Sequence, residues 1–417
     1  MKRTFLLVAT LTGAFLATHS AGEDNPQDPK RPGLIRRGRT VLFTDNDKSD
    51  LGQGIHLGPF APRITTLSSG SGPGAALHFW LPDIGGTPVS IHASAAYSIY
   101  KYRYYDTQIG LVPHLGEHLP RVETSTNALF PLFELEKTSA VPGFNLYASA
   151  RYRDYTREDF YGLGPNSTEA NHAGYRHQDA SYEGVVRFRI SRLAVMGRAG
   201  LMNTSLRPGL DSAWPNLELS QTETTAPGLV TQPDFVHGSA AAWLELRDEP
   251  GNAHRGFAGG VAYARFDDRG GRAFQFGRFT ADVREYFRLG SDRNVVAFRQ
   301  TVSLDQVDAG TRVPFYMRST LGGSGLLRGY GSFRFRDDRF LVFAGEYRFE
   351  ARPEVELALI YEAGKVSPST SPLNVRDLRH SYGLGIRLKS PRKVRVRADF
   401  VRSVEGMRLD LKLGNSF

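Results

Sequence analysis

From Arg63 to the last residue, the chain is a succession of short segments in which apolar and polar residues alternate. Fifteen such segments can be counted, and Gly, Pro, Asp and Asn separate them. Alternation with a period of two is typical of β-strands that bury one face, and no stretch of comparable length shows a helical period. The pattern predicts an antiparallel sandwich or barrel. The segments are Ala75–Leu81, Val89–Tyr100, Tyr102–Val112, Phe144–Tyr152, Tyr182–Ile190, Leu193–Leu206, Phe235–Leu246, Gly256–Phe266, Phe274–Phe287, Val295–Leu304, Phe340–Phe349, Val355–Val366, Tyr382–Leu388, Val394–Val401 and Arg408–Phe417.

Nearly every segment carries charge on one of its two faces. In Arg408–Phe417 three leucines alternate with Arg, Asp and Lys, and Val394–Val401 repeats this arrangement. A charged face could be the wet side of a soluble sheet. So many strands would then enclose an apolar interior too large for side chains to fill. With the faces reversed, apolar residues meet lipid and charges line a watery lumen. The pattern therefore predicts an all-β, transmembrane antiparallel barrel.

The strand count and the aromatic residues refine this prediction. A barrel with both chain ends on one side needs an even number of strands, so we predict sixteen, with the last one hidden in residues 61–74 or 120–137. Aromatic residues near strand ends suit an interfacial girdle. The candidates are Tyr97, Tyr100, Tyr102, Tyr104, Tyr105, Tyr152, Tyr155, Phe160 and Tyr161.

The N-terminal region predicts export. Residues 1–21 have two basic residues, an apolar core and a run of small residues, as a cleavable signal peptide does. Residues 22–60 are rich in Pro and charge without any period, which indicates a periplasmic linker. The barrel is expected in residues 61–417. Together these features predict the outer membrane of a Gram-negative bacterium.

Composition excludes several other classes. The net charge is +9, but Arg is scattered over the alternating segments rather than clustered, so we expect no nucleic-acid partner. There is no Cys, hence no disulfide and no thiolate chemistry. No phosphate loop or metal-ligand cluster is recognisable, so no cofactor or metal is expected. None of the eleven histidines, His78 and His92 among them, has a Ser in a recognisable active-site spacing. We therefore expect no catalytic residues and no enzyme.

The stretch from Leu321 to Arg336 interrupts the alternation with four glycines within eight residues. Such density indicates a loop whose backbone needs unusual φ angles or close approach. One cation, Arg328, lies inside the stretch. Taken alone, the stretch fits an exposed flexible loop with a solvated arginine equally well. The glycines are Gly322, Gly323, Gly325 and Gly329.

These residues, with several others, resemble the BamA/TamA-like outer-membrane protein superfamily, also called the bacterial surface antigen family. Its hallmark, an Arg-Gly-Tyr or Arg-Gly-Phe tripeptide in the sixth extracellular loop, corresponds here to Arg328, Gly329 and Tyr330. The terminal Gly414–Phe417 resembles the signal read by barrel assembly machinery, with Phe417 as its last residue. Further matching stretches are Ala344–Phe349, Ile360–Gly364, Phe160–Ser167 and Tyr382–Gly385.

The resemblance implies that the loop folds into the barrel and that Arg328 meets acids on the following strands. Glu346 shares a strand face with Arg348, and Glu362 shares one with Gly364, so we expect both acid side chains to point toward the lumen. We expect Arg328 to reach Glu346, Glu362 or both, although Glu362 stands where the family usually has Asp. Family members that assemble or transport proteins carry POTRA domains before the barrel. Residues 22–60 are too few for one, so a member without POTRA domains is expected.

Two functions stay open at this point. The resemblance implies a role in outer-membrane biogenesis, as protein insertion, protein translocation or lipid transport. Its partners would be outer-membrane lipids, the barrel assembly machinery and a protein or lipid client. The alternative is a passive, anion-preferring porin. A porin also needs a charged lumen, but it does not explain the loop around Arg328.

Overall fold

The computed structural model describes residues 57–68, 70–113, 130–138, 143–210, 214–323, 325–390 and 393–413. The expected signal peptide, residues 1–21, and nearly all of the expected linker, residues 22–60, lie outside this part of the chain. Phe417 also lies outside it.

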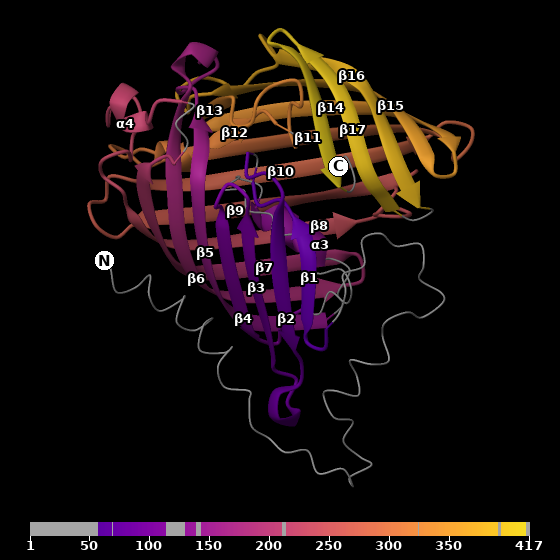
Figure 1. Ribbon diagram of the computed structural model, residues 1–417, viewed down its shortest axis with the longest axis horizontal. Helices are drawn as coiled ribbons and strands as arrows, with labels where there is room; N and C mark the ends of the chain where they lie inside the picture. The colour runs from indigo at the N-terminus through magenta and orange to yellow at the C-terminus, as the bar shows by residue number, and fades with distance from the viewer. Residues whose placement is uncertain are drawn as a thin grey trace.

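Sixteen antiparallel strands form one curled sheet in which each strand pairs with the next one along the chain (Figure 1). This confirms the predicted strand number and the all-β barrel. Residues 308–338 interrupt the sequence of strands and contain a separate two-stranded sheet of β12 (Ser319–Leu321) and β13 (Phe335–Asp337). The strands of the large sheet are β1 (Phe60–Thr65), β2 (Gly74–Leu81), β3 (Ser90–Ser98), β4 (Arg103–Gly110), β5 (Gly143–Phe160), β6 (Ala173–Ile190), β7 (Leu193–Pro208), β8 (Asp234–Glu245), β9 (Gly256–Asp268), β10 (Gln275–Arg288), β11 (Asn294–Val307), β14 (Arg339–Arg352), β15 (Val355–Ser367), β16 (Arg379–Ser390), β17 (Lys393–Ser403) and β18 (Gly406–Leu413).

The sixteenth strand is β1, which lies in the first of the two expected regions. The second region, 120–137, was the wrong alternative, because its described part belongs to the helix α3 (Phe130–Thr138). Pro131 stands at the start of this helix, where its missing N–H costs nothing. Leu132 and Leu135 are three positions apart and both are fully buried. The other short helices are η1 (Ile84–Gly86), η2 (Glu169–Asn171), α4 (Leu217–Ser220) and η3 (Phe315–Met317).

The faces of the strands are arranged as a membrane barrel requires. On β16 to β18 the outward side chains are apolar and exposed: Leu384 is 61%, Phe400 49% and Leu411 67% exposed. The intervening Arg387 and Arg397 point inward and are fully buried. This arrangement confirms that the charged faces line the interior. No helix in the described part of the chain is long and apolar enough to cross a membrane.

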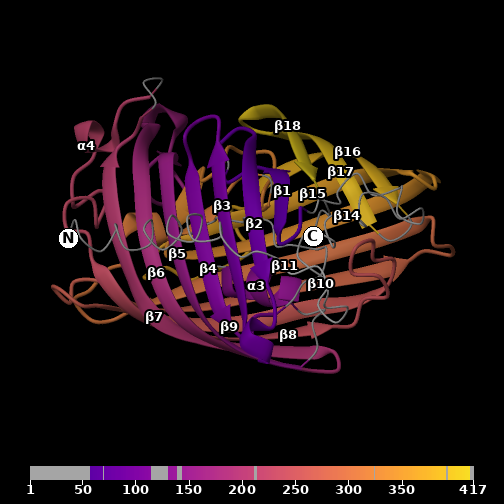
Figure 2. The same ribbon diagram turned by 60° about the horizontal axis from the view of Figure 1, so that its bottom comes forward.

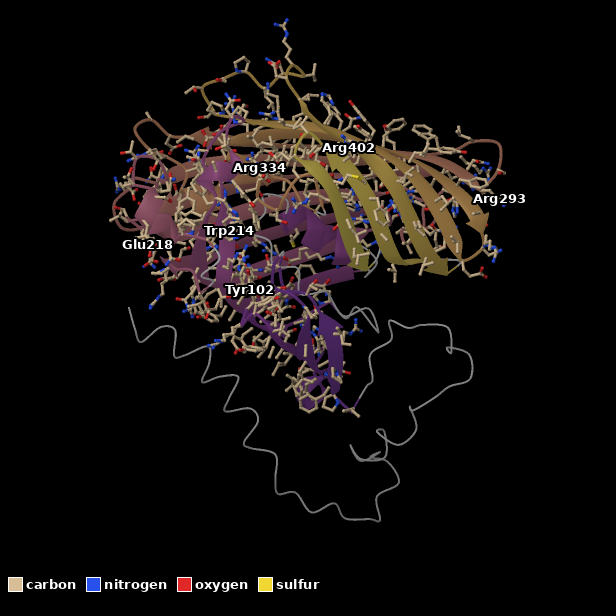
Figure 3. The ribbon with its side chains drawn as sticks, turned by 45° about the horizontal axis from the view of Figure 1, so that its top comes forward. Tyr102, Trp214, Glu218, Arg293, Arg334 and Arg402 are labelled. Carbon is tan, nitrogen blue, oxygen red and sulfur yellow. The ribbon has the colours of Figure 1, made fainter. Side chains whose placement is uncertain are left out.

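The predicted aromatic girdle is only partly present. Tyr97 and Tyr100 are exposed, as a girdle requires, whereas Tyr102, Tyr155 and Phe160 are buried in the interior. Tyr102 donates a hydrogen bond to the carbonyl of Arg157, and its ring lies 5.4 Å from that of Tyr155 (Figure 3). The prediction failed there because it used closeness to strand ends and ignored the two-residue phase, which places these rings on the lumenal face.

Candidate functional site

The loop of residues 308–338, called the Arg328 loop below, connects β11 and β14 and folds inward, as predicted. Its reversal needs residues with positive φ: Gly322 at 113°, Gly323 at 94° and Leu327 at 66°. A Cβ on Gly322 would lie 2.1 Å from the carbonyl oxygen of Gly331, so no other residue fits there. The Gly322 N–H donates to the Leu326 carbonyl, which closes the turn.

Arg328 lies at the tip of this reversal and meets three carboxylates. Its Nε is 2.8 Å from Glu362 Oε1, and its Nη1 is 2.8 Å from both Glu346 Oε1 and Asp399 Oδ2. Its backbone N–H donates to Glu362 Oε2 at 2.6 Å. All four side chains are at least 97% buried. The structure thus brings Arg328 to both acids named from the sequence and to a third acid that was not named.

Two of the three acids also bind arginines of the barrel wall. Glu346 accepts from Arg348 at 3.0 Å and from Arg387 at 3.2 Å. Asp399 accepts from Arg387 and forms an ion pair with Arg397, whose Nε lies 3.0 Å away. Glu362 differs, because its only other partner among the described residues is the Ser381 hydroxyl, at 3.1 Å. Glu362 therefore depends on Arg328 more than the other two acids do.

Gly329 and Tyr330 fit the loop tightly against β16 and β17. A Cβ on Gly329 would approach Ser381 Cβ to 2.5 Å, which only glycine avoids. The Ser403 hydroxyl donates to the Gly329 carbonyl at 2.7 Å. The Tyr330 hydroxyl donates to the His380 carbonyl at 3.2 Å. Gly325 is different, since a Cβ there would meet nothing within 4 Å.

Two further arginines, not singled out from the sequence, anchor the loop to other parts of the barrel. Arg334 binds the Ser167 carbonyl at 2.9 Å and the Glu405 carboxylate at 2.8 Å (Figure 3). Arg336 binds the Tyr175 hydroxyl at 3.1 Å. Ser167 follows β5, Tyr175 lies on β6, and Glu405 lies between β17 and β18. The loop therefore connects the region of β5 and β6 with the turn between the last two strands of the barrel. In the sequence, the alternation of Phe and Arg in residues 333–336 was the one pattern that could have pointed to these two anchoring arginines.

The small sheet of the loop carries a separate ion cluster. Arg318 Nη1 lies 3.0 Å from Asp337 Oδ1 and 3.1 Å from Asp338 Oδ1. Burial raises the pKa of Asp337 to about 6, although the Asp338 N–H and Arg318 act in the opposite direction. Asp337 therefore changes its charge near neutral pH.

The seam between the first and last strands of the sheet is the second notable feature. Within the described residues, β1 pairs with β2 alone and β18 with β17 alone. The Phe60 N–H and carbonyl bond to Leu57 and so point away from β2. The backbone N–H and C=O groups of successive residues point to opposite edges of a strand, so the nitrogen of Pro62, two residues after Phe60, also points to the free edge. As a proline nitrogen it has no hydrogen to donate there. The free edge of β1 is therefore poor in donors.

Ser94 contacts two histidines in the lumen, His78 and, at 3.5 Å, His92, although the sequence spacing gave no sign of this. Pairing of β2 with β3 brings His78 Nδ1 to 3.0 Å from Ser94 Oγ. Both side chains are buried on the lumenal face. The pair therefore does not lie on the lipid-facing side, where an outer-membrane lipase would need it.

A model of the Omp85 superfamily domain matches residues 74–410. No curated protein matches the sequence. Among solved structures, the barrel is similar to BamA from Haemophilus ducreyi lacking POTRA domains 1–3, with a TM-score of 0.59 and 13% identity. This match covers 85% of the present chain and 68% of that one. It shows that the two share a fold.

A lesser likeness is to CdiB from Escherichia coli, with a TM-score of 0.49 and 11% identity. That match covers 84% of this chain and 61% of CdiB, so the chain spans less than two thirds of that relative.

Proposed function

The chain belongs to the Omp85 superfamily, and on that premise we propose that its barrel acts in outer-membrane biogenesis by exchanging a protein or lipid client with the membrane at the seam between β1 and β18. The observation that carries this proposal is the unpaired seam. Backbone groups at an open sheet edge are costly in hydrocarbon, because lipid cannot satisfy them. An incoming strand would satisfy them by adding to the sheet.

The two edges of the seam differ in a way that suits this role. β1 has six residues and carries Pro62 on its free edge, so it pairs weakly. The Arg328 loop supports the opposite side: Arg328 binds acids on β14, β15 and β17, and Arg334 binds Glu405 beside β18. In this proposal the loop acts as a lock that keeps the C-terminal wall in shape while β1 moves. Partners would be outer-membrane lipids, the barrel assembly machinery and the client.

The porin alternative has less support. A passive pore needs an open lumen, whereas here the Arg328 loop and α3 both lie within the barrel and bind its lumenal charges. We also propose that the protein has no catalytic turnover of its own.

A bridged seam tests the proposal. The chain has no Cys, so Ile64→Cys on β1 and Leu411→Cys on β18 can be joined selectively with a bis-maleimide. Purified protein in liposomes would then be given a urea-unfolded eight-stranded barrel as client. We expect the bridge to abolish the accelerated folding of the client.

The matched control bridges two paired, outward-facing positions, Val261→Cys and Ala281→Cys, which lie opposite each other on β9 and β10. This bridge should leave client folding unchanged. A bridged seam that still accelerates folding at the wild-type rate would contradict the proposal.

A further inference from the structure

The helix α3 lies within the barrel and enters from the end opposite to the Arg328 loop. It belongs to the connection between the fourth and fifth strands of the sheet, whereas the Arg328 loop connects the eleventh and twelfth. Strands alternate in direction, so these two connections leave the barrel at opposite ends. Glu218 and Arg293 mark the two ends in Figure 3. Figure 2 draws α3 behind β2–β4 and in front of β8 and β9.

Small residues on the barrel wall make room for this helix. Part of the lumenal face of β9 is formed by Ala258, Gly260 and Ala262 in succession. A Cβ on Gly260 would come within 3.1 Å of Leu132 Cδ2 on α3. Leu132 and Leu135 are fully buried. The wall is therefore shaped to receive the apolar side of a short helix.

Three lumenal arginines bind the acids of α3. Glu134 Oε2 lies 2.5 Å from Arg198 Nη2. Glu136 Oε1 lies 3.0 Å from Arg247 Nη2 and 2.6 Å from Arg284 Nη1. Arg198 is on β7, Arg247 follows β8 and Arg284 is on β10, so the two glutamates join three neighbouring parts of the wall.

Each of these arginines also has an acid on the wall itself. Arg198 lies 3.4 Å from Glu183, and Arg247 lies 2.6 Å from Glu245. Arg284 lies 2.7 Å from Asp282. Departure of α3 would therefore leave every arginine with a carboxylate. Stranding a buried charge is the largest cost of breaking such a pair, and the arrangement avoids it.

The exposure of the glutamates agrees with this reasoning. The side chains of Glu134 and Glu136 are 22% and 20% exposed, whereas those of Glu346 and Glu362 are 0% and 3% exposed. Water already reaches the acids of α3, so moving them into solvent changes their solvation less. The contacts of α3 are thus easier to break than those of Arg328.

We propose that α3 is a releasable plug. The wall surface that it covers, with Arg198, Arg247 and Arg284, is called the seat below, and we propose that this seat is a lumenal binding site for an acidic amphipathic segment. The helix fills the seat while the barrel is at rest and leaves it when the lumen opens. An acidic stretch of a client would bind the same arginines by the same charge-assisted hydrogen bonds. The plug does not depend on the nature of the client, so it goes beyond the proposed function.

Single-channel conductance in planar bilayers tests the plug without any client. The Glu134→Gln/Glu136→Gln variant loses both charges of α3, whereas the arginines keep their wall acids. We expect a severalfold higher mean conductance than that of wild type. Two exposed acids, Glu218→Gln and Glu354→Gln, form the matched control and should leave conductance unchanged.

A second variant tests whether movement of α3 itself causes the change. Glu136→Cys/Arg247→Cys should show raised conductance while its thiols are free. After bridging with a bis-maleimide it should return to the wild-type level. Two results for the Glu134→Gln/Glu136→Gln variant would overturn the proposal. One is wild-type conductance in a protein that still migrates in its compact folded form on unboiled gels. The other is loss of that compact form, since α3 would then be a fixed part of the barrel. Client folding is measured separately, so failure here is distinguishable from failure of the proposed function.

Discussion

Arg328 and Glu362 are joined twice: the backbone N–H of Arg328 donates to one carboxylate oxygen and its Nε–H donates to the other, at 2.6 and 2.8 Å. A single residue thus fixes both the path of the loop and the position of its charge. Because Glu362 lies on β15, the loop is tied directly to the barrel wall.

Replacing Arg328 should destabilise the barrel. Arg328→Ala leaves Glu362 buried without a cation, with only the Ser381 hydroxyl and the backbone N–H of residue 328 as partners, whereas Glu346 and Asp399 keep other arginines. Removing one partner of a buried ion pair costs about 3–5 kcal/mol. We expect unboiled Arg328→Ala protein to lose its compact electrophoretic form at a clearly lower temperature, and protease to cut residues 320–335 in whole cells. Unchanged melting and protection would contradict the lock.

Arg328→Lys should recover only part of this stability. An ammonium group can reach one carboxylate but lacks the planar arrangement of donors that engages two or three. Its backbone N–H still donates to Glu362, because the substitution preserves the main chain. The melting temperature should therefore lie between those of wild type and Arg328→Ala. Full recovery would mean that charge alone, without geometry, holds the loop.

Because Glu362 depends on Arg328 more than Glu346 does, we expect a larger coupling energy between Arg328 and Glu362 than between Arg328 and Glu346. Glu362→Gln combined with Arg328→Ala removes the stranded charge, so the double variant should be more stable than the sum of the two losses implies. Contacting buried residues show couplings of about 0.5–3 kcal/mol. The matched pair Arg328→Ala/Glu346→Gln should couple more weakly, because Glu346 retains Arg348 and Arg387. Equal couplings in urea titrations would refute this distinction.

Much of this site follows from the two-residue period of the strands. Alternation alone placed Glu346 and Glu362 on the lumenal face, and pairing of β14 with β15 then set them on neighbouring strands. Asp399 was also on a charged face in the sequence pattern. Its meeting with Arg328 depends on how the sheet curves around the loop, which no local pattern reports.

The helix α3 could not be predicted for a different reason. It has nine residues, which is too short for a helical period to stand out from its surroundings. Its acids find their partners on β7, β10 and the segment after β8, far away in the sequence. Distant contacts of this kind, like those of Arg334 with Ser167 and Glu405, become visible only in three dimensions.

Gly329 should tolerate no side chain, whereas Gly325 should. Gly329→Ala would drive a Cβ to 2.5 Å from Ser381, and overpacking of this kind costs about 1–3 kcal/mol. Gly325→Ala, in the same loop, places its Cβ in open space and serves as the control. We expect a lower midpoint in urea for the first variant alone. Similar midpoints would mean that the loop can move away from β16.

The raised pKa of Asp337 predicts a pH dependence. The folded protein holds this proton with a pKa of about 6, above the ordinary value of 3.8. Between these values the folded state binds more protons than the unfolded state, so stability falls as pH rises toward 6 and then levels off. Asp337→Asn should remove that contribution. The check compares urea midpoints of both proteins at pH 4.5 and pH 7.5, and an identical pH response would disprove it.

Adding a backbone hydrogen-bond donor at the free edge of β1 should slow the exchange of a client at the seam. Pro62→Val adds an N–H that β18 can accept across the seam, which strengthens the contact that a client must displace, and it raises the preference for an extended strand. One backbone hydrogen bond contributes about 0.5–1.5 kcal/mol, so the initial rate of client folding in liposomes should fall by up to about tenfold. Ile64→Val changes a side chain on the same strand but keeps its N–H, and should leave the rate unchanged. If Pro62→Val folds the client as fast as wild type, the weakness of β1 does not govern exchange at the seam, and the client must enter elsewhere.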